Sequence, residues 1–441
     1  MTTWLVLLGL VAAAGIPYIA WTRLDARRHR RATAIHEDVL ALGDEAVPAS
    51  IHPQIDLDEC IGSGACVRAC PEGEILAITD GRARLINPLS CIGHGACLAA
   101  CPVGAIKLVF GTATRGVELP KLTAAFETSQ AGVYIVGELG GMGLIRNAVE
   151  QGRQAAEAIA RSGRRAGAAA GDTPAVDVVV VGAGPAGIAC ALALQAHQLR
   201  VLVLEQERYG GTIAHYPRAK VVMTGSFDLP GYGKVRRRTM SKEDLLELWH
   251  DVRERTGLPV REGSRVDALR PHGAGWLVQG EGFAQPAGAV VLALGRRGAP
   301  RPLGVPGEHL AKVSYRLLEP EPFADKHMLV VGGGNAAADC ALALAQFGGC
   351  ASVALSYRRA ELARLRPSVR QAVERAFREQ TLRPLLATEV LEIQPEQVQL
   401  RTAQGTQTLR NDHVIVQIGG QAPSALLHTI GIELVEKRGE A

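Results

Sequence analysis

The stretch from Asp177 to Glu205, DVVVVGAGPAGIACALALQAHQLRVLVLE, constrains the fold of this chain more than any other. A run of valines leads into a glycine turn, a helix of small residues follows, and a second apolar strand ends at an acid. In such a unit the first glycine permits a tight turn, the second lets the backbone approach a pyrophosphate, and the third lets helix pack on strand. The helix N-terminus also attracts phosphate. We therefore predict a dinucleotide site; a turn without a ligand is the alternative.

The residues expected to hold this dinucleotide belong to the glycine turn and to the end of the second strand. Glu205 lies where a carboxylate can accept a hydrogen bond from a ribose hydroxyl. The full set of expected contacts is Gly182, Gly184, Pro185, Ala186, Gly187 and Glu205.

The composition fits an α/β chain of several domains. The 441 residues exceed the size of one ordinary domain, and a hydrophobic content of 47% with 50 glycines suits close packing of strands and helices. The net charge of +4 is modest, so it gives no case for nucleic-acid binding. Cys190, Cys340 and Cys350 lie in apolar or glycine-rich stretches and are expected to be small buried hydrophobes.

The N-terminal stretch from Trp4 to Trp21 carries no charge and, at about 1.5 Å per residue, reaches about 27 Å, close to the thickness of a bilayer core. Arginines follow from Arg23 to Arg31, and the positive-inside rule would keep the rest of the chain in the cytoplasm. We therefore expect a single-pass anchor in the cytoplasmic (inner) membrane over residues 1–22 and a basic cytoplasmic linker over 23–50. A cleaved signal peptide would need a basic start, which is missing. A surface-lying or buried helix is the other alternative.

Six of the nine cysteines lie in an internal repeat. CIGSGACVRACP, from Cys60 to Pro71, recurs as CIGHGACLAACP, from Cys91 to Pro102. A short apolar strand follows each copy, and Asp80–Gly81 predicts a hairpin turn between the copies. Two clusters of identical spacing indicate metal ligation in a reducing compartment rather than disulfide bonds.

The repeat resembles the bacterial two-cluster ferredoxin domain, whose run is C-x2-C-x2-C-x3-C-P and whose last cysteine ligates the cluster of the other run. The resemblance covers residues 51–112 and implies two iron-sulfur clusters, [4Fe-4S] or [3Fe-4S]. Carried over by position, one cluster would be held by Cys60, Cys66 and Cys101, and the other by Cys91, Cys97 and Cys70.

Both runs lack the second cysteine, and Ser63 and His94 stand in its place. Three thiolates can hold a [3Fe-4S] cluster, or a [4Fe-4S] cluster whose fourth iron takes a serine oxygen or a histidine nitrogen. A histidine ligand would raise the reduction potential. The sequence leaves open whether either residue is a ligand. Zinc in a Cys3His site is the alternative metal, although it would leave the crossed pattern and the prolines unexplained.

The segment from Gly116 to Ala160 has a strand, VYIV, a glycine turn and an alanine-rich helix. It resembles the element that closes the FAD domain in the thioredoxin-reductase-like family, which implies flavin contacts at Gly137 and at Glu138, where the family has aspartate. In that family the element comes last, whereas here it precedes the glycine turn. We therefore expect a circular permutation, with residues 113–160 completing the FAD domain and residues 161–174 forming a flexible joint. A separate small insertion is the alternative.

From Asp177 the same resemblance covers the rest of the chain. It implies an FAD domain over residues 175–305, an NAD(P) domain over 306–412 and a return to the FAD domain over 413–441. Gly211 and Thr212 stand where the loop of the family passes under the flavin. A second glycine turn, GGGNAA, gives the expected nucleotide contacts Gly332, Gly334, Asn335 and Ala336.

Arginines follow the strand after the second turn, where an acid would select NAD. Arg358, Arg359 and Arg364 can bind a 2′-phosphate, so NADP(H) is favoured over NAD(H), although a solvated basic helix start is the alternative.

The redox cysteine pair of thioredoxin reductases is absent, because the run Ser314–Glu319 reads SYRLLE. A dithiol relay is therefore excluded at this position. The resemblance is nearest to ferredoxin-NADP reductases of the thioredoxin-reductase type and to bacillithiol disulfide reductase-like flavoproteins. No catalytic acid or base is assigned, since hydride transfer would be flavin-mediated, and His215 is interpreted as structural.

Together these features predict a multidomain α/β protein with two Rossmann-like three-layer domains, a ferredoxin-like α+β domain and a transmembrane helix. The expected activity is an FAD-dependent NAD(P)H oxidoreductase that exchanges electrons through its clusters with a protein or quinone partner, because flavins join two-electron donors to one-electron acceptors. Alternatives are a slow redox sensor or assembly factor, a low-molecular-weight disulfide reductase with structural clusters, and a subunit resembling the small subunit of glutamate synthase. The sequence leaves open the direction of electron flow and whether a homodimer forms.

Overall fold

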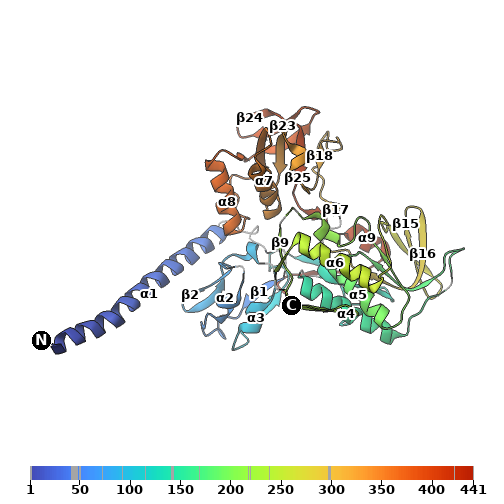
Figure 1. Ribbon diagram of the computed structural model, residues 1–441, viewed down its shortest axis with the longest axis horizontal. Helices are drawn as coiled ribbons and strands as arrows, with labels where there is room; N and C mark the ends of the chain where they lie inside the picture. Colours follow the sequence, from blue (N-terminus) through green and yellow to red (C-terminus); the bar gives the residue numbers. More distant parts are fainter. Residues whose placement is uncertain are drawn as a thin grey trace. The chain divides into compact units, whose positions relative to one another are not determined.

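The computed structural model describes residues 2–40, 48, 51–71, 73–91, 93–114, 116–140, 144–167, 169–216, 218, 220–237, 239–295, 299–421 and 423–440. Contacts divide the chain into two compact units, Met1–Val117 with Lys437–Ala441, and Glu118–Glu436. Figure 1 follows the chain by colour from the N-terminus to the C-terminus.

Helix α1 runs without a break from Thr2 to Leu40 (Figure 1). Among the described residues, no helix combines the length and the apolar character that crossing a membrane requires. The predicted anchor in the cytoplasmic membrane is therefore wrong. The prediction treated residues 4–21 as an element of their own, whereas the helix continues through the exposed arginines that follow. The segment expected to be a linker is thus helical as far as Leu40, and residues 41–47 and 49–50 lie outside the described residues.

The cysteine repeat folds into short helices and strand pairs. Asp80 and Gly81 both have positive φ, 54° and 74°, as a two-residue hairpin turn requires, which confirms the predicted turn. The turn joins the first of the two predicted strands to residues 82–85, whereas the second predicted strand pairs with residues 52–55. Each copy of the repeat places its short helix directly after a left-handed glycine, Gly64 or Gly95. The elements are β1 (His52–Ile55) paired with β4 (Ile106–Val109), β2 (Leu76–Thr79) paired with β3 (Arg82–Leu85), α2 (Ala65–Ala69), η2 (Pro88–Ser90) and α3 (Ala96–Ala100).

The first glycine turn joins a sheet to a helix that is buried on all sides. The sheet has the order β13–β8–β7–β16–β15–β14, parallel as far as β16 and antiparallel beyond it. Apolar residues surround helix α5 because the sheet covers one side and another helix covers the other. The bounds are β7 (Val176–Val181), α5 (Pro185–Ala196), β8 (Val201–Leu204), β13 (Val260–Arg261), β14 (Ala268–His272), β15 (Gly275–Gly280) and β16 (Phe283–Leu292).

The segment that precedes the glycine turn in sequence shares this core. Strand β6 (Val133–Ile135) lies parallel to the end of β16. Helix α4 (Ile145–Ser162) packs along α5 (Figure 1). The two helices approach closely at Gly152, where an added Cβ would lie 2.3 Å from the carbonyl oxygen of Ala186. Strand β6 and helix α4 are therefore part of the core of the first nucleotide domain.

The second glycine turn lies in a parallel sheet of order β18–β25–β19–β20–β21. The strand at 413–416 belongs to this sheet, pairing with β19, although the sequence had suggested a return to the first domain at 413. Its apolar run HVIV fits a central strand, and the chain rejoins the first core at α9 (Ser424–Ile430). The bounds are β18 (Val313–Ser314), β19 (His327–Val331), α7 (Asn335–Phe347), β20 (Ser352–Tyr357), α8 (Pro367–Arg378), β21 (Arg383–Leu386) and β25 (His413–Val416), with the hairpins β22 (Glu389–Ile393), β23 (Gln397–Thr402) and β24 (Gly405–Arg410).

Shorter elements connect these cores. They are β5 (Val117–Pro120) paired with β27 (Leu434–Lys437), η3 (Gly137–Gly140), η4 (Gly211–His215), β9 (Val221–Met223) paired with β12 (Thr239–Ser241), β10 (Phe227–Leu229) paired with β11 (Gly233–Val235), α6 (Lys242–Thr256), β17 (Ala299–Pro300) paired with β26 (Gly420–Gln421), and η5 (Glu321–Phe323).

The joint at residues 161–174 is bonded to the sheet rather than free. The buried carboxylate of Asp177 accepts hydrogen bonds from Ala166 N, at 2.7 Å, and from Arg200 N, at 2.8 Å. Burial by itself would raise the pKa of Asp177, but these bonds and the guanidinium of Arg200 lower it below its ordinary value. A buried carboxylate needs N–H donors, and Asp177 takes one of them from the joint. The flexibility of the joint stays a prediction.

We expect Asp177→Asn to release this joint, because an amide nitrogen would then face a backbone N–H group. The free energy that holds the joint against the sheet should fall by about 1–3 kcal/mol. Tryptic cleavage after Arg164 and Arg165 should therefore rise by roughly tenfold. The rate of appearance of the two fragments on a gel measures the effect. Asp172→Asn, at an exposed position in the same joint, is the control and should leave the rate unchanged. Equal rates in both variants would contradict the assigned role of Asp177.

Candidate functional site

The first glycine turn combines tight packing with one open position. A Cβ at Gly182 would lie 2.5 Å from the carbonyl oxygen of Ala293, and a Cβ at Gly187 would lie 1.9 Å from the carbonyl oxygen of Gly182. A Cβ at Gly184, in contrast, meets nothing within 4 Å. The first and third glycines therefore serve packing, while the second leaves the space that a pyrophosphate needs, so the turn fits a dinucleotide.

Segments from distant parts of the chain meet around this turn. An oxygen of the Glu205 carboxylate accepts a hydrogen bond from Ala183 N at 2.8 Å. A Cβ at Gly211 would lie 3.1 Å from the Cα of Gly184, and a Cβ at Gly137 would lie 3.0 Å from the Cβ of Ala186. The structure thus brings together the first glycine turn, Glu205, the loop at Gly211 and the segment at Gly137. The remaining candidates are Pro185, which opens α5, and the exposed residues Thr212 on η4 and Glu138 on η3.

Burial dominates the environment of Glu205. It raises the pKa of this carboxyl, and the hydrogen bonds from Ala183 N and Glu207 N oppose it only in part. A further donor, such as a ribose hydroxyl, would favour the ionised form. The carboxylate is therefore suited to a ligand that donates hydrogen bonds.

An arginine, a glutamate and a histidine from distant parts of the chain form one cluster. Arg316 forms an ion pair with Glu207, with one nitrogen 3.0 Å from Oε1, and also lies 3.1 Å from Nδ1 of His215. Nε2 of His215 lies 2.6 Å from Oε2 of Glu207. The pKa of Glu207 is lowered by Arg316, and the pKa of His215 is lowered by burial and by Arg316, against the opposing charge of Glu207. His215 is therefore neutral and lies between the two charged groups. One nitrogen of Arg316 is 3.1 Å from Nδ1 and 3.3 Å from Nε2 of His215, and Nε2 lies beside Glu207.

The second glycine turn repeats the plan of the first. A Cβ at Gly332 would lie 2.3 Å from the carbonyl oxygen of Gln417, whereas a Cβ at Gly334 meets nothing within 4 Å. Asn335 begins α7, and its side-chain oxygen accepts a hydrogen bond from Arg366 N at 2.9 Å. Ala336, the next residue, is exposed at the start of that helix. The open position again leaves space for a phosphate.

The arginines that follow β20 lie beside this turn. A Cβ at Gly333 would meet the ring of Tyr357 at 2.2 Å, and Arg358 and Arg359 come next in the chain. Arg358 and Arg364 are exposed, and within the described part of the chain neither forms an ion pair with an acid. Their guanidinium groups can therefore bind an anion.

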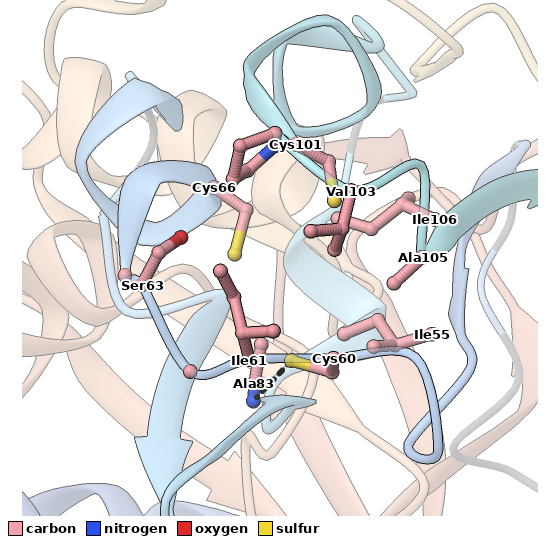
Figure 2. Close-up of a pocket in the computed structure, with 13 residues that line it drawn as sticks. Ile55, Cys60, Ile61, Ser63, Cys66, Ala83, Cys101, Val103, Ala105 and Ile106 are labelled. Atoms are coloured by element: carbon pink, nitrogen blue, oxygen red, sulfur yellow. Dashed lines mark hydrogen bonds between the residues drawn. The ribbon is translucent and has the colours of Figure 1, made fainter.

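Three cysteines from both copies of the repeat line one pocket. Figure 2 shows Cys60, Cys66 and Cys101 around it, together with Ser63 and mainly apolar side chains. The sulfur of Cys60 accepts a hydrogen bond from Ala83 N at 3.4 Å. Two sulfurs from the first copy and one from the second, with an N–H donor, fit the crossed ligand set of a ferredoxin cluster.

The other cysteines of the repeat are less closely defined. Burial raises the pKa of Cys97, and neighbouring Cys70 raises it further. The sulfur of Cys70 lies 4.0 Å from Nε2 of His94. Cys91 is half-buried in the same small core. Among the described residues, no group of three or more histidine, cysteine, aspartate or glutamate side chains is placed to hold a metal ion.

The three cysteines outside the repeat play no part in these sites. Cys190 and Cys340 are fully buried, and burial raises the pKa of both thiols, which confirms that they are small buried hydrophobes. Cys350 is only half-buried.

Comparison with known proteins shows the family. Residues 179–440 match the model "Pyridine nucleotide-disulphide oxidoreductase", and residues 52–102 match the model "4Fe-4S dicluster domain". The chain therefore belongs to the pyridine nucleotide-disulphide oxidoreductase family and carries a 4Fe-4S dicluster domain at its N-terminal side.

Named relatives agree with this assignment. The ferredoxin-NADP reductase of Ignicoccus hospitalis is 33% identical over 184 residues, which cover 42% of this chain and only 56% of that protein. The bacilliredoxin reductase Bdr of Bacillus subtilis is 26% identical over 59% of this chain and 82% of that protein. Among solved structures, the bacillithiol disulfide reductase Bdr of Bacillus cereus has a TM-score of 0.51 and 25% identity, covering 58% of this chain and 82% of that one.

The protein is accordingly an FAD-dependent pyridine nucleotide oxidoreductase similar to ferredoxin-NADP reductases, with FAD, NADP(H) and iron-sulfur clusters as its cofactors. The predicted cofactors and enzyme class are confirmed. The sequence could not reveal the cluster of Arg316, Glu207 and His215, because its members are far apart in the chain.

We expect the stability of the protein to fall as pH falls below about 6.5, in part because of His215. Its pKa in the folded state is lowered from 6.5, so the unfolded state binds more protons between the two values and stability is lost through this interval. Each unit of lowering corresponds to about 1.4 kcal/mol. His215→Asn should therefore flatten the fall of the melting temperature between pH 7 and about pH 5. His309→Asn, at an exposed position, is the control. Parallel curves for the wild type and His215→Asn would contradict the shift.

Proposed function

We propose that this enzyme passes electrons between NADP(H), FAD and its own iron-sulfur clusters, and exchanges them with a small redox protein or a quinone. One observation carries the proposal: sulfurs from both copies of the repeat surround one pocket, on the same chain as two open glycine turns. When bound, FAD accepts a hydride from a nicotinamide and releases electrons singly. The residues of the chain bind and orient the cofactors.

The replacement of the redox thiols supports this route. Arg316 stands in place of a cysteine and is held by Glu207 and His215, so the position carries a fixed cation. A guanidinium cannot form a disulfide, so electrons would have to leave the flavin by another path. The cysteine repeat offers that path.

We further propose that residues 113–160 are the closing element of the FAD domain, displaced by circular permutation. The pairing of β6 with β16, the packing of α4 on α5, and the approach of Gly137 to Ala186 support this interpretation. The permutation would join the cluster domain directly, in sequence, to the flavin domain.

A second function, reduction of a disulfide in a small partner, is favoured by the similarity to bacilliredoxin reductase Bdr. The clusters would then be structural. The two functions differ in their dependence on the clusters.

NADPH should be preferred over NADH because of the arginines after β20. Charge-assisted hydrogen bonds are worth about 1.5–3 kcal/mol, so Arg358→Ala combined with Arg359→Ala should raise the KM for NADPH at least about tenfold and leave that for NADH nearly unchanged. Steady-state reduction of ferricyanide measures both constants. Arg375→Ala, at an exposed position on α8, is the control. Equal increases for both nucleotides would contradict the assignment.

Anaerobic titration of the holoenzyme with NADPH tests the electron route. The flavin absorbance should bleach, and the EPR signal of reduced clusters should follow. Cys101→Ala should keep the flavin response and lose the signal of one cluster, because Cys101 lines the pocket with Cys60 and Cys66. Bleaching without any cluster signal in the wild type would contradict the route, and disulfide reduction that persists in Cys101→Ala would favour the second function.

A further inference from the structure

The residues that replace the second cysteine have the same bonding in both copies of the repeat. Ser63 precedes Gly64 and His94 precedes Gly95, and both glycines are left-handed, with φ of 68° and 74°. The side chain before each glycine then accepts a hydrogen bond from the first N–H of the following helix. Ala65 N lies 3.4 Å from Oγ of Ser63, and Ala96 N lies 3.2 Å from Nδ1 of His94. The repeat thus uses this position to fix the start of a short helix.

The bond to Nδ1 determines where His94 carries its proton. A neutral imidazole has one N–H group, and a ring nitrogen that accepts a hydrogen bond cannot be the one that bears it. The proton of His94 is therefore on Nε2. A protonated ring nitrogen has no lone pair for a metal, so Nε2 in this arrangement is a donor rather than a ligand.

The atom that faces this donor is a cysteine sulfur. Nε2 of His94 lies 4.0 Å from Sγ of Cys70, a residue of the other copy of the repeat. Cys70 also lies near Cys97, the buried second residue of the helix whose start His94 fixes. His94 therefore connects its own copy to the sulfur that the other copy contributes.

We propose that neither Ser63 nor His94 ligates iron, and that His94 is a positioning residue that donates an N–H···S hydrogen bond to Cys70. Each cluster then has three protein thiolates. This proposal rests on the proposed function, because it assumes that both clusters are present. It adds which side chains bind each cluster and which only lie beside it.

The two clusters should consequently differ in reduction potential. A hydrogen bond to a ligand sulfur stabilises the more negative, reduced cluster and raises its potential. In the pocket of Cys60, Cys66 and Cys101 the residue equivalent to His94 is Ser63, whose short hydroxyl replaces the imidazole. There the backbone N–H of Ala83 donates to the sulfur of Cys60. Figure 2 shows the Ser63 hydroxyl and the Cys66 sulfur both pointing into this pocket. A histidine donor is thus specific to the cluster that includes Cys70.

The test uses the full-length holoenzyme and variants His94→Ala, His94→Asn and Ser63→Ala, reduced with dithionite so that neither NADPH nor flavin is needed. Iron and sulfide contents should equal those of the wild type in every variant. In an EPR-monitored redox titration, His94→Ala should lower the potential of one cluster only. His94→Asn should restore most of it, because an amide oxygen can accept from Ala96 N while the amide nitrogen donates to sulfur. Ser63→Ala should leave this potential unchanged.

Pulsed EPR of wild-type protein labelled with 15N-histidine gives a readout that needs no variant. A weak nitrogen coupling, typical of a hydrogen bond, is expected. The strong coupling of a directly bound imidazole, or loss of iron from both His94 variants, would overturn the proposal. Failure of NADPH to reduce the clusters would contradict only the electron route, since the dithionite titration would still measure the effect of His94.

Discussion

The nucleotide domains depend on the close approach of backbone to backbone at glycine. At the first turn the carbonyl oxygen of Ala293 lies 2.5 Å from the place where a Cβ of residue 182 would be, and at Gly152 the helix α4 comes equally close to α5. Any side chain at these positions would separate β7 from β16 or α4 from α5. This packing makes one core from segments on both sides of the joint, and it leaves Gly184 as the open position.

Features that depend on short spacing could be predicted from the sequence. The glycine turns and the Asp80–Gly81 turn follow from residues only a few positions apart, whose geometry is fixed by covalent connections. The sharing of cysteines between the copies of the repeat came from the resemblance to ferredoxins, because Cys66 and Cys101 are far apart in the chain. The family resemblance added the position of β6, because a strand of three residues has too little local signal to indicate its partner.

Features that depend on distant partners could not be predicted. Arg316 gives no local sign that it pairs with Glu207, and the composition of the joint after α4 does not indicate that Ala166 N donates a hydrogen bond to the buried carboxylate of Asp177. The N-terminal prediction failed for a related reason. The uncharged stretch from Trp4 to Trp21 was interpreted by itself, whereas helix α1 continues beyond it to Leu40. The polarity of the whole helix therefore depends on the uncharged stretch and on the arginine-rich stretch that follows it.

The nine cysteines show how surroundings rather than residue type determine chemistry. Cys190 and Cys340 have apolar neighbours, and burial raises their pKa so that a reactive thiolate is disfavoured. Cys60 lies in a pocket with two other sulfurs and receives an N–H donor from Ala83. At the position where the resemblance to thioredoxin reductases would place a redox cysteine, this chain has Arg316. The sulfurs of the repeat thus lie where they can bind a cluster, whereas those of Cys190 and Cys340 only fill the apolar cores. This difference supports the proposed transfer of single electrons through the repeat.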